Sequence, residues 1–293
     1  MSNGRYYLSR VIKIGELDQE KLINAICNPP IIELGKFDWT ITDVKDMRNE
    51  NQPYIFGKLS KYAKLGHIKK VDEVTRTQVD ADAENLLEAS SPFVYLPNFS
   101  GIAFLHVWNS IQEEVFIRRF KMIIESAYDN FFVGCELEPL VDYRAFISKL
   151  KSIDKFTELS AKVYPPNPLF GRLWGNLNEY IKHRNAADIS IKETSSSQKG
   201  VTTNIVSLVT NIMENNQYEP AKPPDITDAA LLMAADGYGR GKVVGYEGDT
   251  LVTIKTAESK KSFLFGKDPS PYDLMLEAHK QFVAISKERD MKH

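Results

Sequence analysis

Three residues near the C-terminus, Asp236, Glu247 and Lys255, are of the types that support metal-dependent cleavage of phosphodiesters. In a nuclease core of the restriction-enzyme type, carboxylates hold the metal ion and a lysine activates the attacking water. That arrangement places a carboxylate two positions before the lysine on one strand, but this chain has Thr253 there. The pattern therefore favours a chain without a catalytic site, and a divergent metal-dependent nuclease is kept as an alternative hypothesis.

The other catalytic patterns are incomplete as well. Residues 237–241 are rich in glycine, but they follow a predicted helix and precede a predicted strand, which reverses the order found in dinucleotide and phosphate loops. Cys27 and Cys135 are too few and too far apart for a disulfide framework or a zinc site. No metal and no cofactor are predicted, and binding is favoured over catalysis.

Basic residues gather at three places where nucleic acid or another anion could bind. They lie on a predicted hairpin, on a predicted helix and at the glycine-rich turn: Lys58, Lys61, Lys69 and Lys70; Arg118 and Arg119; Arg240 and Lys242. Tyr54, Phe56 and Tyr62 interleave with the hairpin lysines, as on a platform that stacks bases. A solvated strand or helix face produces the same pattern, so both interpretations stay open.

The composition is that of a globular chain without a dominating charge. The 293 residues include 43% apolar and 26% charged side chains, and the formal net charge is −2. This balance gives no global basic field of the kind that marks nucleic-acid-binding domains. The N-terminus lacks an apolar signal region, and no apolar run reaches the ~18 residues of a membrane span. A cytoplasmic protein without a membrane partner is predicted.

Residues 1–185 are predicted to form an α+β domain, a mixed and largely antiparallel sheet with helices on one face. Strands are expected over residues 5–14, 37–44, 54–63, 67–79, 92–107 (broken at 98–101), 131–140 and 155–164. Helices are expected over residues 19–27, 111–128, 143–150 and 173–183, with Asp18 and Ser110 as N-caps. A turn at residues 64–66 is expected to join the third and fourth strands into a long hairpin.

The last third of the chain is expected to be organised differently. Residues 186–224 are interpreted as a polar loop over 186–200, a helix over 201–215 and a Pro-rich linker. Residues 225–293 are interpreted as a small β-hairpin and helix unit. Its helix is expected over 229–235, its three strands over 241–246, 250–256 and 261–265, and its last helix over 271–288.

Segments 91–97 with 100–104, 162–168 and 233–239 have the sequences SPFVYLP with SGIAF, KVYPPNP and MAADGYG. They resemble a family of uncharacterised bacterial proteins carried on mobile elements and found near anti-phage genes. The resemblance implies a defence or counter-defence component that works by binding a partner. The preferred hypothesis is accordingly a non-enzymatic binding module for nucleic acid or a protein in a prokaryotic phage-conflict system. The alternatives are the nuclease and an oligomeric structural or inhibitory protein, with a homo-oligomer as its assembled form.

Overall fold

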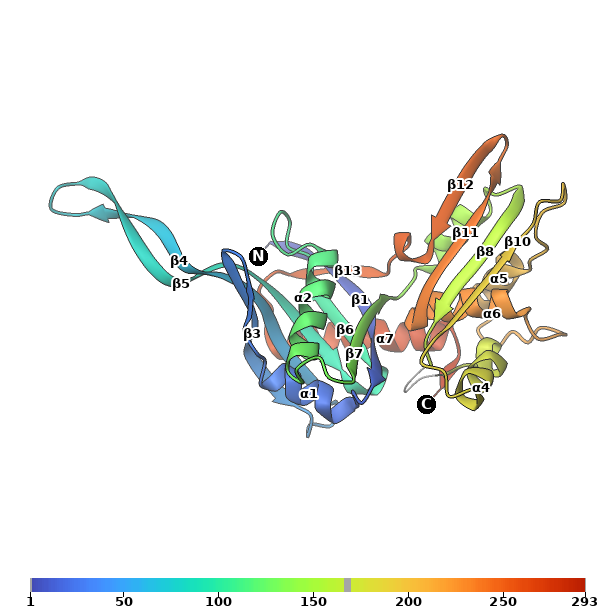
Figure 1. Cartoon of the computed structure of the whole chain (residues 1–293), viewed down its shortest axis with the longest axis horizontal. Helices are drawn as coiled ribbons and strands as arrows, with labels where there is room; N and C mark the ends of the chain where they lie inside the picture. The colour runs from blue at the N-terminus through green and yellow to red at the C-terminus, as the bar shows by residue number, and fades with distance from the viewer. Residues whose placement is uncertain (1, 166–169, 293) are drawn as a thin grey trace.

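The computed structural model describes residues 2–165 and 170–292. Two larger antiparallel sheets and the helices around them make up this part of the chain (Figure 1). The α+β class and the largely antiparallel pairing predicted from the sequence are confirmed. Residues 166–168, which belong to the segment KVYPPNP, lie outside the described residues.

The first sheet has the strand order β13-β1-β6-β5-β4-β3-β2, and β7 pairs with the second half of β1. Its strands span β1 Asn3–Gly15, β2 Ile32–Leu34, β3 Phe37–Met47, β4 Tyr54–Asp72, β5 Thr77–Leu96, β6 Gly101–Leu105, β7 Val133–Pro139 and β13 Ser262–Gly266. Helices α1 (Gln19–Cys27) and α2 (Glu113–Ser126) cover one face of this sheet. Helix α7 (Pro271–Glu288) packs on the other face.

Burial on both faces explains why residues 92–105 are the most apolar strand region. Successive side chains of a strand point to opposite faces. Phe93 and Phe104 point toward α2, where Phe104 stacks on Phe116 with ring centroids 4.0 Å apart. The neighbouring side chains Val94 and Leu96 instead join the apolar cluster that contains α7. The centre of the sheet is therefore covered by helices on both sides.

The second sheet has the strand order β10-β8-β11-β12. Its strands are β8 Lys155–Val163, β10 Ile189–Thr194, β11 Gly239–Glu247 and β12 Thr250–Lys255. The helices on this side of the molecule are α3 Tyr143–Leu150, α4 Gly175–His183, α5 Ile205–Glu214 and α6 Ile226–Met233. A π-helical turn, Ala234–Tyr238, joins α6 to β11, and the short strands β9 (Phe170–Gly171) and β14 (Met291–Lys292) pair with each other. One face of the sheet packs on α5 and α6, and the other face carries the polar side chains.

The long hairpin turns later than the sequence predicts. Strand β4 continues through Gly66 to Asp72, and the turn lies at residues 73–76. The Asp72 carboxylate stabilises this turn by accepting hydrogen bonds from the backbone N–H of Val74 (2.8 Å) and Thr75 (3.1 Å). Gly66 lies inside the strand, where the side chain of Leu86 occupies the space that a Cβ would need. The predicted turn at residues 64–66 is therefore wrong.

Long-range pairing also differs from the prediction in the second half of the chain. The predicted loop 186–200 contains β10, which pairs with β8, while β13 leaves the hairpin unit and pairs with β1. The predicted boundary at residue 185 thus does not coincide with the division between the two sheets. Ser110 does not cap α2, because the N-cap position is Gln112, whose side chain makes no cap hydrogen bond. Asp18 caps α1 as predicted, since its carboxylate accepts a hydrogen bond from the Lys21 N–H at 2.7 Å.

Candidate nucleic-acid interface

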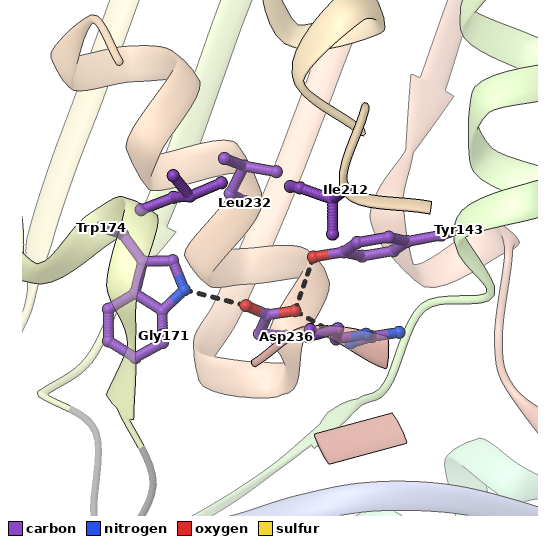
Figure 2. Close-up of a pocket in the computed structure, with 8 residues that line it drawn as sticks. Tyr143, Gly171, Trp174, Ile212, Leu232 and Asp236 are labelled. Atoms are coloured by element: carbon purple, nitrogen blue, oxygen red, sulfur yellow. Dashed lines mark hydrogen bonds and ion pairs between the residues drawn. The ribbon is translucent and has the colours of Figure 1, made fainter. Parts of the chain in front are cut away.

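Asp236 is a buried structural carboxylate in the π-helical turn between α6 and β11. Figure 2 shows its side chain between Tyr143 and Trp174, and Arg289 forms an ion pair with it. One oxygen accepts from the Tyr143 hydroxyl at 2.7 Å and from Arg289 Nη1 at 2.9 Å, and the other accepts from Trp174 Nε1 at 2.8 Å. The cavity beside it measures about 10 Å³, which is room for one water molecule. The carboxylate is committed to internal partners and has no space for a substrate.

The two arginines around Asp236 tie separate elements together. Arg289, at the end of α7, also donates to the carbonyls of Ala235 and Val141. Arg10, in the middle of β1, donates to the carbonyl of Asp236 at 3.2 Å. Both guanidinium groups are buried, so their hydrogen bonds to carbonyl and carboxylate oxygens replace lost water. The cluster fastens the first sheet, the π-helical turn and α7 to one another.

Tyr143 is held in its protonated form inside this cluster. Burial raises the pKa of its hydroxyl well above that of an exposed tyrosine, and the neighbouring Asp236 charge raises it further. The hydroxyl therefore stays a hydrogen-bond donor to Asp236 at all ordinary pH values. It is a packing and orienting group and not a general base.

The three residues of the nuclease hypothesis are not brought together. Asp236 is buried in the cluster described above, while Glu247 and Lys255 are exposed at opposite ends of the β11–β12 hairpin. Glu247 is paired with Thr250, and Lys255 is paired with Lys242. Lys242 lies five residues from Glu247 along β11, so the Glu247 and Lys255 positions are about 16 Å apart along the hairpin. Within residues 2–165 and 170–292, no three His, Cys, Asp or Glu side chains are placed so that they could hold a metal ion.

The hairpin lysines do not form a basic platform. Lys58 makes ion pairs with Asp43 at 3.1 Å and Asp268 at 3.4 Å, and the Lys61 ammonium lies 3.7 Å from the centre of the Phe37 ring. Lys69 and Lys70 lie on the projecting part of the hairpin, residues 64–88. That segment carries four Lys and Arg against six Asp and Glu, so its net charge is −2.

The predicted basic helix face is only partly free. Arg118 on α2 is exposed, but the guanidinium of Arg119 lies 5.2 Å from the centre of the Trp39 ring and donates to Met122. Cation–π contact with a neighbouring strand is a packing role. Figure 1 places the hairpin in the first sheet and α2 over that sheet, away from strand β11 of the second sheet. Strand β11 carries Arg240 and Lys242. The predicted basic groups therefore do not converge on one surface.

Arg240 and Lys242 do gain basic neighbours, and they lie in strand β11 rather than in a turn. An open groove of about 450 Å³ runs over the polar face of the second sheet. Five basic side chains from all four strands of that sheet line it: Lys162, Lys192, Arg240, Lys242 and Lys255. We call this surface the cationic groove.

The strand register explains why these five side chains share one face. Lys192 is paired with Ser160, Ser160 with Lys242, and Lys242 with Lys255, which makes a row across β10, β8, β11 and β12. The next row joins Lys162 to Arg240. Because side chains alternate along each strand, the intervening apolar residues point to the helices and the basic ones point to water.

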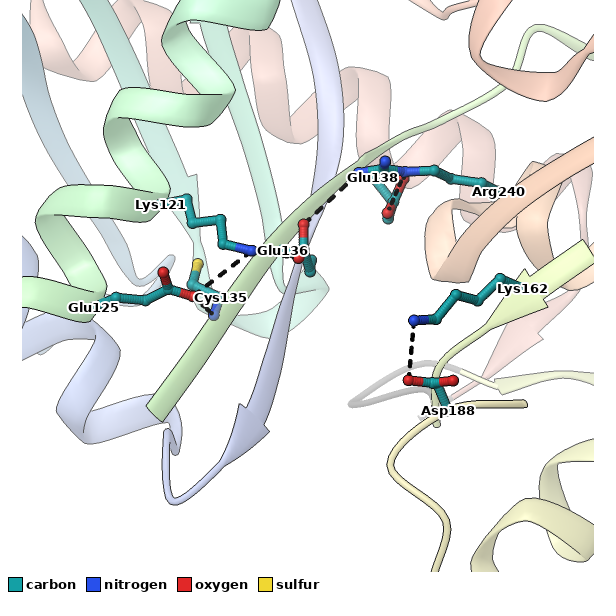
Figure 3. Close-up of polar contacts among 8 residues, drawn as sticks. All are labelled: Lys121, Glu125, Cys135, Glu136, Glu138, Lys162, Asp188 and Arg240. Atoms are coloured by element: carbon teal, nitrogen blue, oxygen red, sulfur yellow. Dashed lines mark hydrogen bonds and ion pairs between the residues drawn. The ribbon is translucent and has the colours of Figure 1, made fainter. Parts of the chain in front are cut away.

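Carboxylates pair with four of these five cations. Figure 3 shows Asp188 at Lys162, with an O–N distance of 3.1 Å, and Glu138 at Arg240, at 2.8 Å. Glu158 lies in the sheet between Lys192, at 2.9 Å, and Lys242. The side chains of the four paired cations are 40–63% exposed, whereas Glu158 is 16% exposed and Glu138 is fully buried. The cations of the groove are therefore more exposed than their partner carboxylates, of which Asp188 is the most exposed at 37%.

The pKa shifts of the two central carboxylates follow from these positions. Burial raises the pKa of Glu138, and the hydrogen bond from Arg240 works against that increase. Hydrogen bonds from Lys242 and Lys192 lower the pKa of Glu158. Glu158 thus stays ionised and holds the two lysines in fixed positions, where they line the groove in a preorganised arrangement.

Sequence reasoning did not identify Lys162 and Lys192 as candidates. Lys192 lies in the segment interpreted as a loop, and Lys162 lies in a strand assigned to the other sheet. A signal was present, because Ile189 and Ile191 alternate with Ser190 and Lys192 in the manner of a half-buried strand. The partner strands, however, are distant in sequence, and no local pattern states which strands pair.

Among the described residues, no helix combines the length and the apolar character required to cross a membrane. A search of curated proteins finds none that matches this chain. The expected link with mobile elements and anti-phage genes is not tested by these findings and stays a prediction. A family model described as "Domain of unknown function (DUF4747)" matches residues 20–270, which include every strand of the two larger sheets except β1. The chain belongs to this family.

Proposed function

We propose that this protein is a non-enzymatic binding module that holds the phosphate backbone of a nucleic acid in the cationic groove. The observation that carries the proposal is the convergence of five basic side chains from four strands on one solvent-facing groove. Phosphate contacts by Lys and Arg supply most of the sequence-independent affinity for nucleic acids.

The groove is suited to a backbone rather than to bases. From Lys192 on β10 to Lys255 on β12 the row crosses three strand spacings, about 14 Å, so several cations can contact one strand at once. Four of the five cations are lysines, which act as point charges, and Ser160 lies among them. Aromatic side chains that would stack bases do not line the groove within the described residues. Binding tolerant of sequence is expected.

The salt dependence of binding tests this proposal. Fluorescence anisotropy with labelled single-stranded and duplex oligonucleotides would give the Kd at 50 and 200 mM salt. If all five cations contact phosphates of a single strand, the slope of log K against log salt reaches about −3.5, and the affinity falls about 100-fold between these concentrations. Affinity that is absent at 50 mM salt, or that ignores salt, would refute the proposal.

The phage-conflict setting is part of the proposal and is supported by the sequence resemblance. We expect cells that carry the gene to differ from cells that lack it in the efficiency with which phages form plaques. The matched strain carries a variant with Lys242 and Lys255 both changed to Glu, because this change reverses two neighbouring charges of the groove. Equal plaque counts in all three strains would contradict this part of the proposal.

A further inference from the structure

Strand β11 carries basic side chains at one end of its solvent face and an aromatic side chain at the other. Its side chains alternate between the solvent and the buried face, and the solvent-facing ones are Arg240, Lys242, Val244 and Tyr246. Arg240 and Lys242 line the cationic groove, whereas Tyr246 lies outside it, four residues beyond Lys242 or about 13 Å along the strand. The face that holds the groove therefore continues to an aromatic ring.

Tyr246 has an apolar neighbour and a cationic neighbour on this face. Leu251 is its cross-strand partner on β12, so the two side chains lie side by side. Tyr246 is 37% exposed and Leu251 is 58% exposed. On the other side, Lys155 of β8 is paired with Tyr246, and its ammonium lies 5.7 Å from the centre of the Tyr246 ring. We call these three residues the aromatic patch.

The aromatic patch does not contribute to the core. On the opposite face of the same hairpin, Val243 and Ile254 are buried in the apolar cluster beneath the sheet, which Tyr246 and Leu251 do not join. Figure 1 shows the far end of the β11–β12 hairpin away from the first sheet. The ring is therefore accessible to a ligand that already lies in the groove.

An aromatic ring beside a phosphate-binding groove distinguishes a single strand from a duplex. Lysine and arginine contacts to phosphates are independent of sequence and form with either kind of nucleic acid. Bases stack on aromatic side chains, also with little regard to sequence, when their faces are free. In a duplex the bases are already stacked and paired, and taking one out costs free energy. Stacking therefore adds affinity for single strands only.

We propose that the aromatic patch stacks a base of a single-stranded nucleic acid whose phosphates lie in the cationic groove, and that this stacking gives the protein a preference for single strands. The inference rests on the proposed function, because the groove supplies the phosphate contacts. It identifies the substrate class and assigns Tyr246 as the residue that determines it.

The charges between the groove and the aromatic patch are compatible with a phosphate backbone. Glu158 lies along this path, but its carboxylate is paired with two of the groove lysines. Lys155 brings a further cation to the position of Tyr246. Beyond the ring, the exposed residues Glu247 and Asp249 would repel another phosphate. The bound strand is therefore expected to end its contacts at Tyr246.

Tyr246→Ala separates stacking from phosphate contact in the anisotropy assay. It should weaken the binding of a single-stranded oligonucleotide about 5- to 100-fold, the range for the loss of one base–aromatic stack. The slope of log K against log salt should stay unchanged, because no phosphate contact is lost. Tyr246→Phe keeps the ring and should bind as the wild type does. The matched control is Tyr272→Ala, which removes an exposed tyrosine from α7 on the first sheet and should not alter binding.

A duplex of the same sequence completes the experiment. At 200 mM salt, where phosphate contacts contribute less, the wild type should bind the single strand more tightly than the duplex. Tyr246→Ala should leave the affinity for the duplex unchanged. Equal losses for single strand and duplex would give the tyrosine a structural role and overturn the inference.

The outcomes separate this inference from the function on which it rests. A wild type without salt-dependent binding to either oligonucleotide would refute the proposed function itself. Salt-dependent binding that Tyr246→Ala leaves unaltered would overturn the stacking role and leave the groove in place. Duplex binding by the wild type as tight as single-strand binding at 200 mM salt would likewise overturn the preference alone.

Discussion

Replacement of Asp236 by Ala should destabilise the fold severely without removing any catalytic group. The substitution removes a carboxylate that accepts three hydrogen bonds, from Tyr143, Trp174 and Arg289. It leaves the buried Arg289 guanidinium without the carboxylate oxygen that lies 2.9 Å from it in the wild type. Removing one partner of a buried ion pair costs about 3–5 kcal/mol, since the other charge stays buried and uncompensated.

The loss should be larger than the carboxylate's size suggests, because one buried acid faces two buried arginines. Asp236→Asn keeps the shape but not the charge, so it should recover only part of the loss. Urea unfolding followed by tryptophan fluorescence gives the free energy of unfolding for both variants. Glu247→Ala is the matched control, and a change within about 0.5 kcal/mol is expected for this exposed carboxylate. A loss below about 1 kcal/mol for Asp236→Ala would refute the clamp described here.

Three further predictions concern buried or constrained groups. Burial lowers the pKa of the Lys13 ammonium from 10.5 in the unfolded chain to about 8 in the folded chain. Between pH 8 and pH 10.5 the unfolded chain therefore binds the proton more tightly than the folded chain, and the free energy of unfolding rises with pH. From pH 7.5 to 10 the wild type should gain about 2 kcal/mol over Lys13→Met in urea unfolding, and parallel pH profiles would contradict this. Burial also raises the pKa of the Cys135 thiol, so iodoacetamide should label only Cys27 in the native chain, and rapid labelling of both would argue against the packing. Gly237 has a φ of 84°, and a Cβ at this position would meet the side chain of Arg10. Gly237→Ala should therefore lower the free energy of unfolding by about 1–3 kcal/mol. An unchanged melting temperature would contradict this prediction.

Locally determined elements could be predicted from the sequence. Helix α1 begins after Asp18, whose carboxylate caps it, and α7 begins after Ser270 with Pro271 in its first turn. These signals act within a few residues, and both helices have the predicted bounds. The breaks at residues 98–101 and after Glu247 were likewise marked by residues that favour turns.

Features set by distant residues could not be predicted. Gly66 suggested a turn, but Leu86 on the partner strand fills the space above it and the chain runs straight through. The polar alternation around Lys192 acquires its meaning only when β10 pairs with β8. Asp236 was named only as a candidate residue of the alternative nuclease site, because its burial depends on Arg289, 53 positions away, and on Trp174.

The most direct test of the central claim compares two charge-reversed double variants in the oligonucleotide anisotropy assay. Lys242→Glu with Lys255→Glu changes cross-strand neighbours in the cationic groove. Lys69→Glu with Lys70→Glu makes the same change of charge on the projecting part of the β4–β5 hairpin. The groove variant should weaken binding and reduce the slope of log K against log salt by about 1.4, because two phosphate contacts are lost. The hairpin variant should bind as the wild type does. Equal losses in both variants, or a loss in the hairpin variant alone, would contradict the assignment of nucleic-acid binding to the groove.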